Sequence, residues 1–178
     1  MGTPDPRLAA DVLAGMRDIP DFPEPGVVFK DFTPLLLDRA LRDRIVEDTV
    51  QRRRGQVDVV AGIEARGFIL GAMIAHELGV GFVPVRKEGK LPGAVHATSY
   101  TLEYGTATLE IHQDAVSHHE RVLVVDDVLA TGGTLAATCD LIERCGASVA
   151  GIEIVLELGF LAGRDKLQAY DLHSLVIT

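Results

Sequence analysis

The stretch Arg121-Val-Leu-Val-Val-Asp-Asp-Val-Leu-Ala-Thr-Gly-Gly-Thr134 joins an apolar run to two adjacent carboxylates and then to a turn rich in glycine and threonine. The uniform apolarity of residues 122–125 predicts a strand buried on both faces, as in a parallel sheet. Asp126 and Asp127 follow at the carboxyl end of that strand, where open α/β sheets bind their ligands. Residues 130–134 supply backbone N–H groups and hydroxyls at the start of a predicted helix, which suits a phosphate. Together these groups predict a ligand with both hydroxyls and a phosphate, such as a phosphorylated sugar.

The alternative is an ordinary connection from a strand to a helix with a polar edge. It accounts for the apolar run, since any buried parallel strand has one. It does not account for two neighbouring acids, which repel each other unless a hydroxyl-bearing or cationic partner lies between them. We therefore favour a ligand site.

Composition predicts one domain that spans residues 1–178. The formal charge of −9 argues against nucleic acid or an anionic membrane as the main partner. Neither a signal peptide nor an apolar run as long as a membrane span is apparent. Cys139 and Cys145 are predicted to be reduced residues that pack in the interior. We expect a cytoplasmic protein.

The rest of the chain alternates apolar strands with helices, which predicts an α/β fold with a parallel sheet. Residues 99–111 break this alternation and predict an inserted antiparallel hairpin that covers the site. Near the N-terminus, three prolines between residues 20 and 25 predict an irregular, rigid loop laid over the domain. The basic run 52–54 is assigned to the C-terminal dipole of its helix. The strands are expected at 57–63, 81–85, 121–127, 149–156 and 173–178, and the helices at 8–19, 39–54, 67–78 and 134–145.

A second turn with anion-binding features follows strand 57–63. In Glu64-Ala-Arg-Gly67, the guanidinium of Arg66 and the amides of a helix start suit a phosphate. The alternative is that Arg66 is a surface charge paired with Glu64. The matching turn after strand 121–127 favours the anion site.

A basic loop follows strand 81–85. Arg86, Lys87 and Lys90 stand close together before Gly93, and the loop is interpreted as an electrostatic funnel for a polyanion rather than as a solvated charged face. Two anion-binding turns and this loop imply a ligand with more than one phosphate group. The six histidines show no metal-site spacing, so magnesium is expected to arrive on substrate phosphates rather than on protein ligands.

These residues resemble a known family. Residues 122–134 are similar to the phosphoribosyl-pyrophosphate signature of type I phosphoribosyltransferases. Four further segments, 20–31, 62–68, 86–93 and 99–105, resemble adenine phosphoribosyltransferases, and the resemblance continues to the C-terminus. It implies the type I phosphoribosyltransferase fold, a mainly parallel central sheet flanked by helices. A hood would be formed by residues 1–35 and hairpin 98–112.

The resemblance implies an enzyme of purine salvage. It would transfer the 5-phosphoribosyl group of phosphoribosyl pyrophosphate to N9 of adenine, giving AMP and pyrophosphate, with Mg²⁺ bound to the substrate and a homodimer as the assembly. The Glu64–Ala65 peptide bond is expected to be cis. The implied catalytic residues are Glu103, Tyr104, Asp127 and Arg66. Phosphoribosyl pyrophosphate and AMP would bind to Asp126, Asp127, Ala130, Thr131, Gly132, Gly133 and Thr134, pyrophosphate to Ala65, Arg66, Gly67, Arg86, Lys87 and Lys90, and adenine to Val28, Phe29, Lys30 and Glu103.

Two departures from the family pattern stand out. Lys30 occupies a position where many members carry arginine, so a contact from this side chain to the base is in question. Ala65 replaces a serine often found in the pyrophosphate turn, which removes a hydroxyl but leaves the backbone amides. Two alternatives stay open: the same reaction on another purine, and a non-catalytic regulator of the same fold that binds phosphoribosyl pyrophosphate or a nucleotide.

Overall fold

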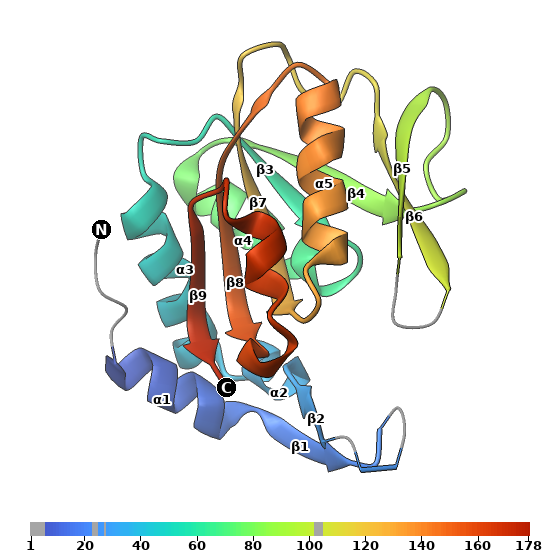
Figure 1. Ribbon diagram of the computed structural model, residues 1–178. Helices are drawn as coiled ribbons and strands as arrows, with labels where there is room; N and C mark the ends of the chain where they lie inside the picture. Colours follow the sequence, from blue (N-terminus) through green and yellow to red (C-terminus); the bar gives the residue numbers. More distant parts are fainter. Residues whose placement is uncertain (1–5, 23–24, 27, 102–104) are drawn as a thin grey trace.

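The fold is built on one seven-stranded sheet with the order β5-β6-β4-β3-β7-β8-β9 (Figure 1). This computed structural model describes residues 6–22, 25–26, 28–101 and 105–178. Five neighbouring strands pair in parallel, as the sequence predicts. They are β3 (Val59–Ile63), β4 (Gly81–Lys87), β7 (Arg121–Leu129), β8 (Ser148–Glu157) and β9 (Leu172–Ile177).

Helices cover both faces of the sheet, which explains why its central strand β3 is apolar throughout. One face packs against α1 (Pro6–Gly15), α3 (Arg39–Arg53) and α4 (Arg66–Leu78). The other packs against α5 (Gly133–Arg144) and the second of two short 3₁₀ helices, η1 (Gly159–Leu161) and η2 (Gly163–Leu167). Every residue of β3 is buried. Cys139 and Cys145 are both free and buried, as predicted.

The predicted hairpin is present and extends the sheet at one edge. It consists of β5 (Val95–Thr101) and β6 (Thr106–His112), which pair antiparallel. Among the described residues, the hairpin pairs with β4 at Arg86↔Glu110 and Lys87↔Leu109, and the backbone N–H of Glu88 donates to Thr108 at 3.1 Å. Figure 1 shows it projecting from the edge of the sheet beside α5. Contacts with α5 therefore also hold the hairpin against the rest of the domain.

The expectation of irregular structure over the proline-rich segment was partly wrong. Residues Arg17–Pro20 form strand β1, which pairs antiparallel with β2 (Val28–Asp31). Proline is tolerated here because Pro20 ends an edge strand, where its missing N–H removes no bond from a central ladder. The predicted first helix therefore ends earlier, at Gly15. A short helix, α2 (Thr33–Leu37), follows β2.

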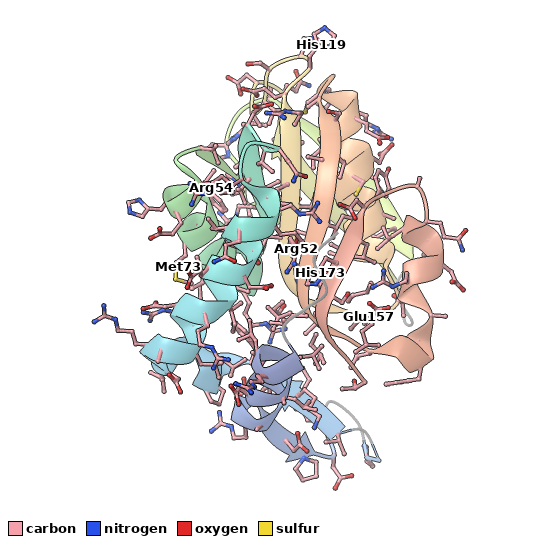
Figure 2. All side chains as sticks on the ribbon, turned by 90° about the vertical axis from the view of Figure 1, so that its left-hand side faces the viewer. Arg52, Arg54, Met73, His119, Glu157 and His173 are labelled. Carbon is pink, nitrogen blue, oxygen red and sulfur yellow. The ribbon has the colours of Figure 1, made fainter. Side chains whose placement is uncertain are left out.

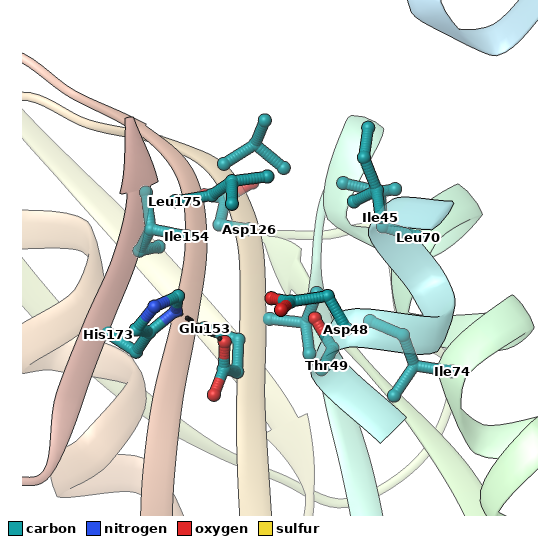
Figure 3. Close-up of a pocket in the computed structure, with 12 residues that line it drawn as sticks. Ile45, Asp48, Thr49, Leu70, Ile74, Asp126, Glu153, Ile154, His173 and Leu175 are labelled. Atoms are coloured by element: carbon teal, nitrogen blue, oxygen red, sulfur yellow. Dashed lines mark hydrogen bonds and ion pairs between the residues drawn. The ribbon is translucent and has the colours of Figure 1, made fainter. Parts of the chain in front are cut away.

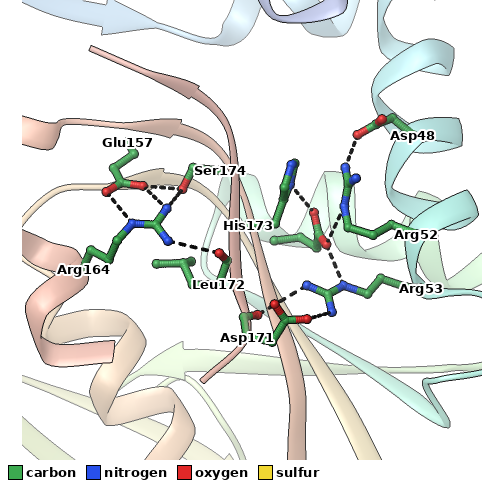
Figure 4. Close-up of polar contacts among 10 residues, drawn as sticks. Asp48, Arg52, Arg53, Glu157, Arg164, Asp171, Leu172, His173 and Ser174 are labelled. Carbon is green, nitrogen blue, oxygen red and sulfur yellow. Dashed lines mark hydrogen bonds and ion pairs between the residues drawn. The ribbon is translucent and has the colours of Figure 1, made fainter. Parts of the chain in front are cut away.

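The assignment of the basic run to a helix dipole was also incomplete. Arg53 is 1% exposed, and its guanidinium lies 2.6 Å from Glu153 on β8 and 2.6 Å from Asp171. Arg52 contacts Glu153 as well, while Arg54 is exposed (Figures 2 and 4). These residues tie the end of α3 to the sheet rather than only completing a helix terminus.

Candidate active site

The two predicted anion-binding turns lie side by side at one edge of the sheet. Strands β3 and β7 are parallel neighbours, with Gly62 opposite Val125, so the turns that follow them emerge together. A Cβ atom at Gly67 would stand 2.6 Å from the carbonyl oxygen of Val125 and 3.1 Å from Oδ1 of Asp126. The turn after β3 therefore packs directly on the acidic end of β7, and only glycine fits at the contact.

Arg66 supplies the cationic partner that the neighbouring acids require. Its Nε lies 2.6 Å from Oδ2 of Asp127, whose side chain is 5% exposed. The alternative pairing of Arg66 with Glu64 is wrong, because Glu64 instead accepts hydrogen bonds from Arg86 Nη2 at 3.0 Å and from the backbone of Lys87 at 3.1 Å. Arg66 thus connects the turn after β3 with the acids after β7.

The environment of the two acids opposes their ionisation. Burial, followed by the charge of Asp127, raises the pKa of Asp126 well above its ordinary value. Burial also raises the pKa of Asp127, although the Arg66 guanidinium opposes this shift. The backbone N–H of Asp127 donates to Oδ1 of Asp126 at 2.9 Å. A pair of this kind binds best to a partner that donates hydrogen bonds or carries positive charge.

Residues 130–134, which are predicted to bind phosphate and are named the phosphate loop, lead into α5. Gly132 precedes the helix with φ of 76°, a left-handed conformation that favours glycine. Ala130, Thr131, Gly133 and Thr134 lie around it at the start of a 12-residue helix, where N–H groups and the helix dipole favour an anion.

Sequence reasoning missed the support beneath this loop. Gly163, at the start of η2, approaches it so closely that a Cβ atom there would stand 2.1 Å from the carbonyl oxygen of Ala130. A Cβ atom at Gly132 would likewise stand 2.3 Å from the carbonyl oxygen of Gly163. Nothing in the local pattern around Gly163 points to this contact, since its partner lies far away in the chain.

The predicted basic loop was partly wrong, because Arg86 and Lys87 belong to β4 and only Lys90 lies in the loop that follows it. The end of β4 is attached to the turn after β3. The Glu64–Ala65 peptide bond is cis, as expected. The hydrogen bond from Arg86 lowers the pKa of Glu64, and a second hydrogen bond joins Arg86 to the carbonyl oxygen of Lys90 at 3.0 Å. Arg86, Lys87 and Lys90 therefore stand next to Ala65, Arg66 and Gly67 at one end of the site.

Phe29, the residue predicted to stack on the base, also lies at this site. The guanidinium carbon of Arg66 lies 5.8 Å from the centre of the Phe29 ring, and Phe22 packs edge-on against the same ring at 5.3 Å. Val28 is 56% exposed. Lys30 follows Phe29 along β2, so the two side chains point to opposite faces of the strand. The Nζ atom of Lys30 lies 2.6 Å from Asp18 on β1. The side chain of Lys30 is thus engaged across the β1–β2 pair.

Glu103 and Tyr104 lie outside the described residues. The strands on either side of them, β5 and β6, bring the hairpin to the start of α5, where Thr134 Oγ1 donates to Tyr100 Oη at 3.1 Å. Tyr100, near the end of β5, therefore lies next to Thr134 at the start of α5.

A small cavity of ≈10 Å³ lies behind Asp126 (Figure 3). Apolar side chains of α3 and α4 line it together with Asp48, Glu153 and His173. This volume is about that of one water molecule, so the cavity does not hold a substrate. Within the described part of the chain, no three His, Cys, Asp or Glu side chains are grouped to hold a metal ion. None of the helices described is long and apolar enough to cross a membrane.

Comparison with known proteins identifies the family of this site. A family model for the phosphoribosyl transferase domain matches residues 38–175. The adenine phosphoribosyltransferase of a Nocardioides species is 55% identical over 178 residues, covering 97% of this chain and 96% of the relative. This chain belongs to the adenine phosphoribosyltransferase family.

Solved structures agree with the membership. Adenine phosphoribosyltransferase from Thermoanaerobacter pseudethanolicus matches with a TM-score of 0.91 at 48% identity, covering 96% of this chain and 99% of that one. The enzyme from Trypanosoma brucei, in complex with AMP, pyrophosphate and ribose-5-phosphate, matches with a TM-score of 0.90 at 27% identity, covering 99% of this chain and 82% of that one. The predicted type I phosphoribosyltransferase fold is confirmed, and the chain is an enzyme of purine salvage that forms AMP from adenine.

Proposed function

We propose that the site defined by Arg66 binds phosphoribosyl pyrophosphate and adenine together and joins them, with release of pyrophosphate. The observation that carries this proposal is the position of Arg66, 2.6 Å from Asp127 and 5.8 Å from the Phe29 ring. One side chain thus touches the residues assigned to the ribose and to the base, and it belongs to the turn assigned to pyrophosphate. A site that bound only ribose, only a base or only pyrophosphate would not need one arginine in contact with all three sets of residues.

The sugar phosphate is assigned to β7 and the loop after it. Asp126 and Asp127 accept hydrogen bonds from the two ribose hydroxyls. Such bonds stabilise the ionised carboxylates, which burial in the free protein disfavours. Backbone N–H groups of residues 130–134 and the N-terminus of α5 bind the 5-phosphate. The hydroxyls of Thr131 and Thr134 add donors to the same anion.

The pyrophosphate group is assigned to the opposite side of the site. The amides of Ala65 and Gly67 and the guanidinium of Arg66 bind it, with Arg86, Lys87 and Lys90 adding positive charge. Ala65 contributes no hydroxyl, so its backbone amide and Arg66 provide the direct contacts. Magnesium would enter with the substrate, bound to its phosphates, and would neutralise charge on the leaving pyrophosphate.

The residues of this chain act on the charges that change during transfer. Positive charge builds on the ribose as the bond to pyrophosphate breaks, and the carboxylates of Asp126 and Asp127 stabilise it. Arg66 stabilises the negative charge that gathers on the leaving group. We assign Glu103 to accept or polarise the proton at adenine N7, and Tyr104 to close the hairpin over the site so that water is excluded.

Adenine is assigned to the face of Phe29, with the backbone at Val28 reading its edge. Lys30 carries a smaller part of base recognition than its position suggests, because its ammonium group already pairs with Asp18. We also assign residues 1–178 to one domain, with residues 1–35 and 98–112 as its hood. The assembly is proposed to be a homodimer, and free, buried Cys139 and Cys145 fit the reducing cytoplasm.

The test is an assay of nucleotide formation with phosphoribosyl pyrophosphate, Mg²⁺ and each of adenine, guanine, hypoxanthine and xanthine. We expect AMP from adenine and no comparable product from the other bases. A preferred product from another purine would support the alternative substrate. Binding of phosphoribosyl pyrophosphate with no turnover of any base would support the non-catalytic regulator.

The role of Glu103 has its own test. We expect Glu103→Ala to lower kcat by roughly 10²- to 10⁴-fold, the usual contribution of a general acid or base, while the Kd for phosphoribosyl pyrophosphate changes little. Calorimetric titration and steady-state rates measure the two quantities separately. An unchanged kcat would remove Glu103 from the mechanism.

A further inference from the structure

In the part of the β5–β6 hairpin that the structure describes, three polar contacts join it to α5. Thr98 Oγ1 donates to Asp140 at 2.6 Å, Arg144 donates to the carbonyl oxygen of Ala97 at 3.0 Å, and Thr134 Oγ1 donates to Tyr100 Oη at 3.1 Å. The first two contacts reach the middle and end of the helix. Only the third reaches a residue of the phosphate loop.

Tyr100 is placed by the pleat of its strand. Thr98 and Tyr100 lie on the face of β5 that contacts α5, and the Tyr100 ring packs against the apolar core. Ser99, between them, faces the other way and bonds to Thr108 across the hairpin at 3.0 Å. The Tyr100 side chain therefore points toward Thr134 because of the geometry of its strand.

The contact has a consequence for hydrogen-bond donors. A threonine hydroxyl has one proton to donate, and here Thr134 gives it to Tyr100. A phosphate oxygen only accepts, so Thr134 must turn its proton to the ligand when the loop binds a phosphate. The Tyr100 hydroxyl can then donate to Thr134 and form a chain from Tyr100 through Thr134 to the phosphate. Such chains strengthen each member by polarisation.

We propose that Tyr100 is a positioning residue that couples occupancy of the phosphate loop to the position of the β5–β6 hairpin. The proposal rests on the assigned function, in which residues 130–134 bind the 5-phosphate and the hairpin covers adenine. Tyr100 itself touches neither substrate. Through Thr134, binding of a phosphate at one side of the site fixes β5, so the described part of the hairpin takes its position when the sugar phosphate is in place.

The test compares Tyr100→Phe with Ser99→Ala. Both variants remove one hairpin hydroxyl, but only the first removes the contact with the phosphate loop. The hydrogen bond between Tyr100 and Thr134 exists with and without ligand, so only its strengthening on binding affects the affinity. We therefore expect Tyr100→Phe to raise the Kd for AMP by roughly 2- to 3-fold and to leave the Kd for magnesium pyrophosphate unchanged. Ser99→Ala should change neither value measurably. Calorimetric titration of the full chain measures all of them, and thermal unfolding confirms that both variants fold.

Hydrogen exchange of peptides from residues 95–112 separates coupling from simple support of the loop. In the unsubstituted chain and in Ser99→Ala, saturating AMP should slow exchange in the hairpin. In Tyr100→Phe this slowing should be lost even when AMP is saturating. Unchanged AMP affinity, or retained slowing in Tyr100→Phe, would overturn the proposal. AMP binding by a chain that makes no AMP from adenine would instead overturn the assigned function and leave this test valid.

Discussion

Substitution of Gly163 by alanine should damage the phosphate loop without touching a substrate. The new Cβ atom would stand 2.1 Å from the carbonyl oxygen of Ala130 and 2.8 Å from the backbone nitrogen of Gly132. A carbon–oxygen contact normally closes to about 3.3 Å, so the two backbones must separate by roughly 1 Å. The clash involves main-chain atoms on both sides, and no side-chain rotation can relieve it.

The segment that carries Gly163 cannot easily move away. Arg164, the next residue, is held by Glu157 at 2.5 Å and by the carbonyl oxygen of Leu172 at 3.1 Å, and Ser174 donates to Glu157 at 2.6 Å (Figure 4). The displacement therefore falls mainly on the phosphate loop. A shift of about 1 Å in a positioned group can lower the rate about 10²-fold, which corresponds to about 2.7 kcal/mol of transition-state stabilisation.

We expect Gly163→Ala to lower kcat/KM for phosphoribosyl pyrophosphate by about this factor, measured from initial rates at saturating adenine. The matched control is Gly159→Ala in the same segment, where the Cβ atom would meet only Ile177 Cγ2 at 3.2 Å and Thr178 O at 3.4 Å. The control should stay within about 2-fold of the unsubstituted chain. If Gly163→Ala behaves like Gly159→Ala, the contact does not hold the loop in its working position.

Three further substitutions test other parts of the structure. Burial and an acidic neighbour raise the pKa of Asp126, so ionisation of its carboxyl group lowers the stability of the fold as the pH rises above 3.8. Asp126→Asn should therefore raise Tm at pH 7, lose that advantage near pH 3 and bind ribose phosphates more weakly. A lower Tm at pH 7 would contradict this. Arg53→Met leaves the buried Glu153 without its main partner and should lower the free energy of unfolding in urea by about 3 kcal/mol at unchanged kcat; a loss below about 1 kcal/mol would show that the ion pair is dispensable. Lys30→Ala and Asp18→Ala should alter the KM for adenine equally and by less than about 3-fold, since the two side chains pair at the surface; a larger effect in Lys30→Ala alone would mean that Lys30 reads the base.

The parallel core could be predicted because its determinants are local. A strand buried on both faces must be apolar along its whole length, as residues 122–125 are, and a glycine-rich turn before a helix marks its carboxyl end. The β1–β2 pair could not be predicted in the same way. Its strands are four residues long and one ends at a proline, so neither is long enough to show a clear alternation of apolar and polar residues. Arg53 shows the same limit, because its partner Glu153 lies 100 residues away in sequence.

Sequence offered two interpretations of Arg66, an anion-binding group and an ion pair with Glu64, and the structure shows an ion pair with a different acid, Asp127. The pattern offered Glu64 as the partner because that residue is adjacent in sequence, but the parallel pairing of β3 with β7 brings Asp127 within 2.6 Å instead. This partner matters for the assigned function. Phosphoribosyl pyrophosphate presents anionic oxygens that can replace Asp127 at Arg66, and hydroxyls that can replace Arg66 at Asp127. A simple anion satisfies only the first exchange and leaves a buried carboxylate without its cation, which is unfavourable. The ion pair between the two turns therefore favours a ligand that carries both groups over free pyrophosphate.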